Sequence, residues 1–125
     1  MKRILLSFAL LTLAAISIAC APSAAAPVPS GPVADGPTIV AKDLKFDKTS
    51  VEVKADQNFT LHFDNQDAAP HNVAIYGDSG FSQKVSIGEI ITSARKDQVV
   101  PALKAGTYPF RCDIHPDMKG EIVAR

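Results

Sequence analysis

The chain has 125 residues and contains no tryptophan, only two cysteines and only three histidines. Aromatic residues make up 6% of it, so an apolar core must rest on aliphatic side chains and on six phenylalanines. The formal net charge is zero and neither half is rich in basic residues, which argues against a nucleic-acid partner. The length favours one domain. Because cysteine and histidine are scarce, the places at which they gather are informative.

The N-terminus has the pattern of an export signal. Two basic residues precede an almost unbroken apolar run, Ile4 to Ile18, which is shorter than the roughly 20 residues that a membrane span needs. The run ends in Ser17-Ile18-Ala19-Cys20, which resembles the lipobox of bacterial lipoproteins, although Leu is usual where Ser stands here. We expect residues 1–20 to be a signal peptide whose cleavage leaves Cys20 as a lipidated N-terminus. One alternative is ordinary signal cleavage near Ala24–Ala26, and the other is an uncleaved membrane helix.

A linker is expected next. Residues 21–37 hold five of the nine prolines, together with several alanines. This composition does not build a core and favours an extended tether. We therefore predict a folded domain at residues 38–125 of an extracytoplasmic protein, in the periplasm or on the outer cell surface, which is attached to a membrane by its lipid.

From residue 38 onward the apolar pattern has a period of two. Phe59, Leu61 and Phe63, for example, alternate with polar residues. Turn-forming residues separate such runs, and none has a convincing helical period, although the irregular stretch at residues 80–96 could contain a short helix. Seven or eight short strands in this length predict an all-β protein folded as a β-sandwich.

The second cysteine, Cys112, lies near the C-terminus. Two cysteines in an exported protein normally suggest a disulfide. A Cys20–Cys112 bridge, however, would tie the domain to a flexible segment and would stabilise little structure. If Cys20 is lipidated instead, Cys112 is an unpaired thiol, which oxidises unless it is buried or bound to a metal ion.

Cys112 begins the segment Cys-Asp-Ile-His-Pro-Asp-Met, which contains His115 and ends at Met118. Thiolate, imidazole and thioether groups together suit copper in both oxidation states, and blue-copper electron-transfer sites use two His and one Cys with a weak axial Met. The segment lacks one His, and a single short loop cannot surround an ion. His71, which starts a strand after the turn at residues 65–70, is the candidate for the missing ligand.

Two segments resemble the cupredoxins, the plastocyanin and amicyanin family. Residues 64–73, Asp-Asn-Gln-Asp-Ala-Ala-Pro-His-Asn-Val, are similar to the segment with the first His ligand, and residues 106–120 are similar to the C-terminal ligand loop, with the short Cys-x2-His-x2-Met spacing of amicyanin. The resemblance covers Thr38 to Arg125 and implies a Greek-key β-sandwich. It also implies one copper ion, as Cu(I) or Cu(II), at one end of the sandwich, with the ligands His71, Cys112, His115 and Met118.

The resemblance implies roles for neighbouring residues as well. Asn72 would brace the Cys-bearing loop through hydrogen bonds. The ring edge of His115 would reach the surface and serve as the electron port. Ala69, Pro70 and Pro116 would surround it as a small apolar docking patch.

These features predict a mononuclear type 1 copper protein that carries single electrons between extracytoplasmic redox proteins and is not an enzyme. Its partners would dock transiently near His115, and we expect a monomer. The alternative is copper storage or delivery, although such sites usually contain many Met or His. A copper enzyme would need a second centre, for which three His are too few. A structural zinc site with Cys, His and His is chemically possible.

Several residues near the ligands have simpler interpretations. Met118 could be a core side chain that binds no ion. His62 alternates with apolar neighbours and is expected to face solvent, outside the site. Asp67, Asp113 and Asp117 are interpreted as solvated loop residues or as guides for a basic partner.

Overall fold

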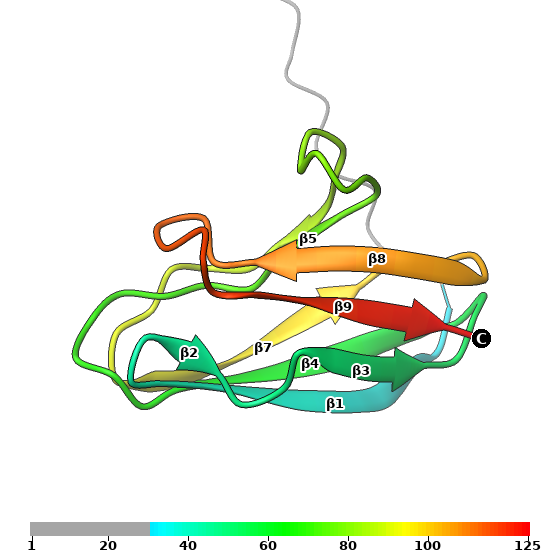
Figure 1. Ribbon diagram of the computed structural model, residues 1–125. Coiled ribbons are helices and arrows are strands. Elements are labelled where there is room, and N and C mark those ends of the chain that lie inside the picture. The colour runs from blue at the N-terminus through cyan, green and yellow to red at the C-terminus, as the bar shows by residue number, and fades with distance from the viewer. Residues whose placement is uncertain (1–30) are drawn as a thin grey trace, which may run out of the picture.

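The computed structural model describes residues 31–125, which form nine β-strands in two facing sheets (Figure 1). The strands are β1 (Val33–Lys42), β2 (Lys45–Phe46), β3 (Ser50–Val53), β4 (Asn58–Asn65), β5 (Ala74–Tyr76), β6 (Lys84–Ile87), β7 (Ala94–Val100), β8 (Gly106–Arg111) and β9 (Lys119–Ala124). One sheet has the strand order β2-β1-β4-β7, and the other has the order β3-β9-β8-β5-β6. The chain therefore folds as the all-β sandwich that the alternation predicts.

Both sheets mix parallel and antiparallel pairs. β1 lies parallel to β4, and β3 lies parallel to β9, whereas the remaining pairs are antiparallel. The prediction of seven or eight strands falls one or two short of the nine in the structure. The two residues of β2 are too few to display a period, so a pattern search cannot detect this strand. Within residues 31–125 there is no helix with the length and apolar character needed to cross a bilayer.

The core lies between the two sheets and follows the alternation of the strands. Phe59, Leu61 and Phe63 of β4 are all buried, whereas the residues between them are partly exposed. Phe46 of the short β2 packs its ring against those of Phe63 and Phe110, so it joins the two sheets. Burial of aliphatic and aromatic side chains supplies the main stabilisation of the sandwich.

β1 begins at Val33, inside the segment predicted to be a linker. Residues 33–35 pair with residues 58–60 of β4, and the register then shifts between Asp35 and Thr38. Gly36 lies in this irregularity, with its backbone against the carbonyl oxygen of Thr60. The boundary predicted at Thr38 therefore lies within a strand, because a Gly-Pro pair here makes a bulge and does not end the sheet. The predicted signal peptide, Cys20 and most of the predicted linker lie outside the described residues.

Candidate metal centre

His71 is held in place by backbone pairing before β5 begins. Its N–H donates to the carbonyl of Ile91 and its carbonyl accepts from the N–H of Ile91, both at 3.0 Å. The side chain is fully buried, with 0% of its surface exposed. The backbone of His71 is thus fixed by an isolated antiparallel β-bridge to Ile91, and its ring is held by the surrounding core.

Cys112 reaches the same place through the pairing of β5 with β8. In this antiparallel pair Ala74 lies opposite Arg111, so the residues just before β5 lie beside those just after β8. Cys112 is fully buried and has no disulfide partner among the described residues. The structure therefore brings the predicted ligand segments together, although they are about forty positions apart in the chain.

The loop between β8 and β9 is closed by its own backbone hydrogen bonds. The N–H of Cys112 donates to the carbonyl of Met118, and the N–H of Met118 donates to the carbonyl of His115, both at 2.9 Å. His115 is partly exposed, whereas Met118 is 3% exposed and belongs to the core. The loop that contains Cys112, His115 and Met118 joins β8 to β9. Figure 1 shows this loop at one end of the sandwich.

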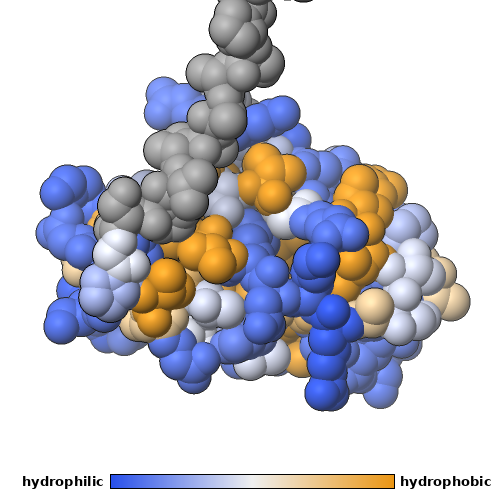
Figure 2. Space-filling view, turned by 180° about the vertical axis from the view of Figure 1, so that it is seen from behind, coloured by the Kyte–Doolittle hydropathy of each residue, from blue (hydrophilic) through white to orange (hydrophobic). Residues whose placement is uncertain are grey.

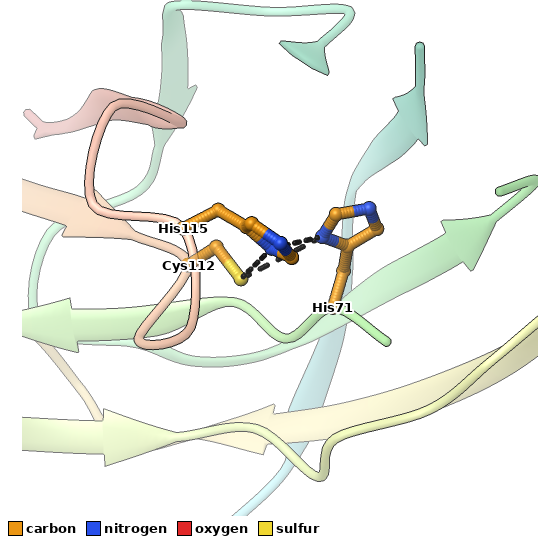
Figure 3. A group of neighbouring side chains, drawn as sticks. All are labelled: His71, Cys112 and His115. Atoms are coloured by element: carbon orange, nitrogen blue, oxygen red, sulfur yellow. Dashed lines mark hydrogen bonds between the residues drawn. The ribbon is translucent and has the colours of Figure 1, made fainter. Parts of the chain in front are cut away.

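Three ligand atoms converge at this end (Figure 3). Nδ1 of His71 lies 3.1 Å from Nδ1 of His115, and Sγ of Cys112 lies 3.7 Å and 3.8 Å from these two nitrogens. Within residues 31–125, no other group of three His, Cys, Asp or Glu side chains is close enough to share an ion.

These separations fit a bound metal ion. Bonds of about 2.0–2.1 Å to nitrogen and about 2.3 Å to sulfur, at angles of roughly 100–120°, place two nitrogens roughly 3.1–3.6 Å apart and nitrogen and sulfur roughly 3.3–3.8 Å apart. The three measured distances fall within these ranges or at their edges. Two His and one Cys in a plane, with a Met available nearby, form the donor set of electron-transfer copper sites.

Asn72 connects the two ligand segments. Its Oδ1 accepts from the N–H of Asp113 at 2.9 Å, and its Nδ2 donates to a carboxylate oxygen of Asp113 and to the carbonyl of Gly88. The amide is buried, so these bonds are not exchanged for bonds to water. Asn72 therefore joins the segment of His71 to the loop that follows Cys112 through hydrogen bonds.

Asp113 receives further support from Tyr76, whose hydroxyl donates to Oδ1 at 2.5 Å. Burial disfavours ionisation of Asp113, but the hydrogen bonds from Tyr76 and Asn72 outweigh it and hold the pKa of this carboxyl below its ordinary value. Asp113 is an exposed loop residue, as interpreted, but it is also hydrogen-bonded to Tyr76 and Asn72. The aromatic Tyr76 at the end of β5 gave no signal of this role in the sequence.

Asp67 also differs from its interpretation as a solvated residue. Its side chain is 15% exposed, and Oδ2 lies 3.1 Å from Nε2 of His71. The N–H of Leu44, and after it the N–H of Asp43 and the ring of His71, hold the pKa of Asp67 below its ordinary value, although burial opposes this. The sequence contained one clue, because Asp67 lies only four positions before His71.

His62 lies on the outer face of β4, as the alternation predicts, and is not part of the cluster. It is bonded and not merely solvated. Nδ1 lies 2.7 Å from a carboxylate oxygen of Asp97, and Nε2 lies 2.8 Å from one of Asp35.

The chain belongs to the family described as the cupredoxin-like domain, whose profile matches residues 7–124. None of the curated proteins matches this sequence.

Solved structures show the same fold. Reduced auracyanin from the photosynthetic bacterium Roseiflexus castenholzii superposes with a TM-score of 0.66 at 20% identity, covering 75% of this chain and 99% of that one. Auracyanin A, a "blue" copper protein from the green thermophilic photosynthetic bacterium Chloroflexus aurantiacus, gives 0.62 at 24% identity, covering 72% and 100%. Amicyanin from Paracoccus versutus gives 0.55 at 25% identity, covering 78% and 85%.

Proposed function

We propose that the protein is a mononuclear type 1 copper protein that carries single electrons. The observation that carries this proposal is the convergence of Nδ1 of His71, Nδ1 of His115 and Sγ of Cys112 at mutual distances of 3.1–3.8 Å. A thiolate with two imidazoles suits copper in both oxidation states, and copper supplies a one-electron couple when it is bound.

The surroundings of the ligands suit electron transfer better than catalysis or release. His71 and Cys112 are fully buried, and backbone hydrogen bonds fix the segments of both. A rigid site changes little between the two oxidation states, so little reorganisation accompanies the transfer. Buried ligands also oppose rapid exchange of the ion. A storage or delivery protein needs such rapid exchange, so the burial argues against that function.

Met118 is the proposed axial ligand. A backbone hydrogen bond joins Met118 to Cys112, and the Met118 side chain is nearly inaccessible to water. A weak thioether ligand at this place would tune the potential of the ion without fixing its geometry.

The partly exposed His115 is the proposed electron port, because His71 is fully buried and offers no route to the surface. Its neighbour Ile114 is 42% exposed, and Pro116 is exposed as well. Figure 2 shows several apolar groups on this face, and one of them lies toward the right of the view, on the side of the molecule that carries the β8–β9 loop. Redox proteins would dock there transiently, since a small apolar patch suits a brief encounter.

The visible spectrum of the copper-loaded domain tests this function. The oxidised protein should absorb intensely in the visible range through charge transfer from the Cys112 thiolate to the ion, and Cys112→Ser should abolish the band. His62→Gln is the control, because His62 lies outside the cluster, and it should leave the spectrum unchanged. A wild-type protein that binds copper without colour contradicts the proposal, and rapid loss of copper to a moderate chelator would favour delivery.

The proposed location is outside the cytoplasm, where the domain would act as a monomer anchored to a membrane by a lipid on Cys20. The sequence supports this through the export signal, the lipobox and the Pro-rich segment that follows. A membrane-bound carrier of this kind would exchange electrons with partners near the same surface.

A further inference from the structure

We propose that Asp67 is a positioning residue for the metal centre, and that it determines which nitrogen of His71 faces the ion. This inference rests on the proposed function of the site. The contact that carries it joins Nε2 of His71 to Oδ2 of Asp67 at 3.1 Å, on the side of the ring away from the cluster.

The two nitrogens of His71 have different surroundings. Nδ1 faces Sγ of Cys112 and Nδ1 of His115, whereas Nε2 faces Asp67. A carboxylate can only accept a hydrogen bond, so the nitrogen that faces it carries the proton and donates. The lone pair of Nδ1 is then free for the ion, and burial of the ring excludes water as an alternative partner for Nε2.

Asp67 is itself fixed by the turn that joins β1 to β2. The N–H of Asp43 donates to Oδ1 at 2.8 Å, and the N–H of Leu44 donates to Oδ2 at 3.0 Å. Asp43 and Leu44 have φ values of 53° and 57°, which is the left-handed turn that joins two strands tightly and directs both amides to the carboxylate. The carboxylate therefore has a defined orientation and cannot rotate away without losing these bonds.

The main chain of Asp67 is held as firmly as its side chain. Its N–H donates to Oδ1 of Asn65 at 2.9 Å, and its carbonyl accepts from the N–H and the hydroxyl of Ser93. Asn65 in turn donates to the carbonyl of Ile91, the residue whose backbone pairs with His71. One network thus fixes both His71 and the acceptor behind its ring.

The arrangement has two consequences for the bound ion. It leaves Nδ1 ready to bind before the ion arrives, which favours affinity, since loss of such a partner typically costs about 10–100-fold in metal binding. It also places a negative charge behind one ligand. This charge stabilises the more positive, oxidised state and lowers the reduction potential.

Asp67→Asn tests the effect of the charge, because the amide has almost the same side-chain volume as the carboxylate but is neutral. The amide has one acceptor atom where the carboxylate has two. If its oxygen takes the place of Oδ2, it still accepts from Leu44 and from Nε2 of His71, but it carries no charge and loses the bond from Asp43. Asp64→Asn is the matched control, because it removes the same charge three positions earlier, where the carboxylate contacts Gln66 and Arg95 and no proposed ligand.

The first measurement needs neither a variant nor an ion. Nitrogen NMR of the copper-free wild type should show the proton of His71 on Nε2, and a proton on Nδ1 would overturn the proposal. In copper-loaded protein, Asp67→Asn should give a more positive reduction potential than Asp64→Asn gives, because it removes the charge behind His71. Asp67→Ala, which leaves Nε2 of His71 without its acceptor, should weaken copper binding at least tenfold. Equal shifts of the reduction potential in Asp67→Asn and Asp64→Asn would show that Asp67 acts only as a general charge, which would overturn the proposal.

The two proposals fail separately. If the copper-loaded wild type lacks the intense visible band, the proposed function is wrong, while the ring form of His71 in the copper-free protein still reports on Asp67. If the band is present but His71 carries its proton on Nδ1, the function stands and the role of Asp67 is wrong.

Discussion

Both nitrogens of His62 face a carboxylate, which is an unusual arrangement for a side chain on the outside of a sheet. Asp35 of β1 lies on one side of the ring and Asp97 of β7 on the other, so the contact joins three neighbouring strands. Two acceptors are satisfied together only when both nitrogens carry protons. The hydrogen bonds that the His62 ring donates to Asp35, and then to Asp97, accordingly raise the pKa of His62 above its ordinary value.

This residue predicts a pH dependence of stability with a definite sign. Because the pKa is raised in the folded state, the stabilisation is complete below the unfolded pKa of about 6.5 and is lost as the pH rises through the folded pKa. The melting temperature of the copper-free wild type should therefore exceed that of His62→Gln by more at pH about 6 than at pH about 8. A constant difference between the two proteins across this range would contradict the prediction.

The start of β1 is an element in which local composition and long-range pairing disagree. Val33, Ala34 and Asp35 are followed by a Gly-Pro pair, a composition that indicates a linker. Pairing with residues 58–60 of β4 nevertheless makes a strand of them. The close approach of Gly36 to β4 is what permits this pairing.

Gly36→Ala tests whether this part of β1 contributes to the fold. An added Cβ would lie 2.4 Å from the carbonyl oxygen of Thr60 and 2.9 Å from the ring of Phe59, so one strand must shift. We expect a loss of about 1–3 kcal/mol in the free energy of unfolding, measured by chemical denaturation. Gly77→Ala is the control, because its Cβ would meet only side-chain atoms of Gln83 and Val85 at 3.3 Å or more. Equal losses in the two variants would show that the pairing is unimportant.

The sequence predicted those parts of the fold and the site that depend on near neighbours. Alternation revealed β4 and the buried faces of Phe59, Leu61 and Phe63, and the spacing of Cys112 and His115 indicated a metal loop. The sequence could not predict the proposed role of Asp67. The orientation of its carboxylate depends on the backbone amides of Leu44 and Asp43, which lie 23 and 24 positions upstream. Contacts of this kind arise only when the strands have paired, and no local pattern records them.

At the scale of the whole molecule, the early start of β1 shortens the expected tether. If Cys20 is the lipidated first residue, residues 21–32 separate the lipid from the sheet. At about 3.1 Å per residue in an extended polyproline conformation, this segment spans at most roughly 40 Å. Partners of the carrier would therefore have to present their own redox centres close to the membrane surface.

Mass analysis of the mature protein tests this arrangement. We expect the chain to begin at Cys20 and to carry added acyl mass, with the protein in the membrane fraction. Cys20→Ala should release it, because stable attachment needs two or more acyl chains. An unmodified N-terminus near residues 24–26 in the soluble fraction would instead indicate ordinary signal cleavage.

The separation of His71 from Cys112, 41 positions along the chain, also sets an order of events in time. An unfolded chain presents Cys112, His115 and Met118 in one short stretch, but His71 joins them only after β5 has paired with β8. A complete binding site therefore does not exist until the sandwich has closed, and folding must precede firm capture of the ion. In the proposed exported protein, burial of the Cys112 thiol in the closed sandwich would protect it against oxidation until the ion is bound.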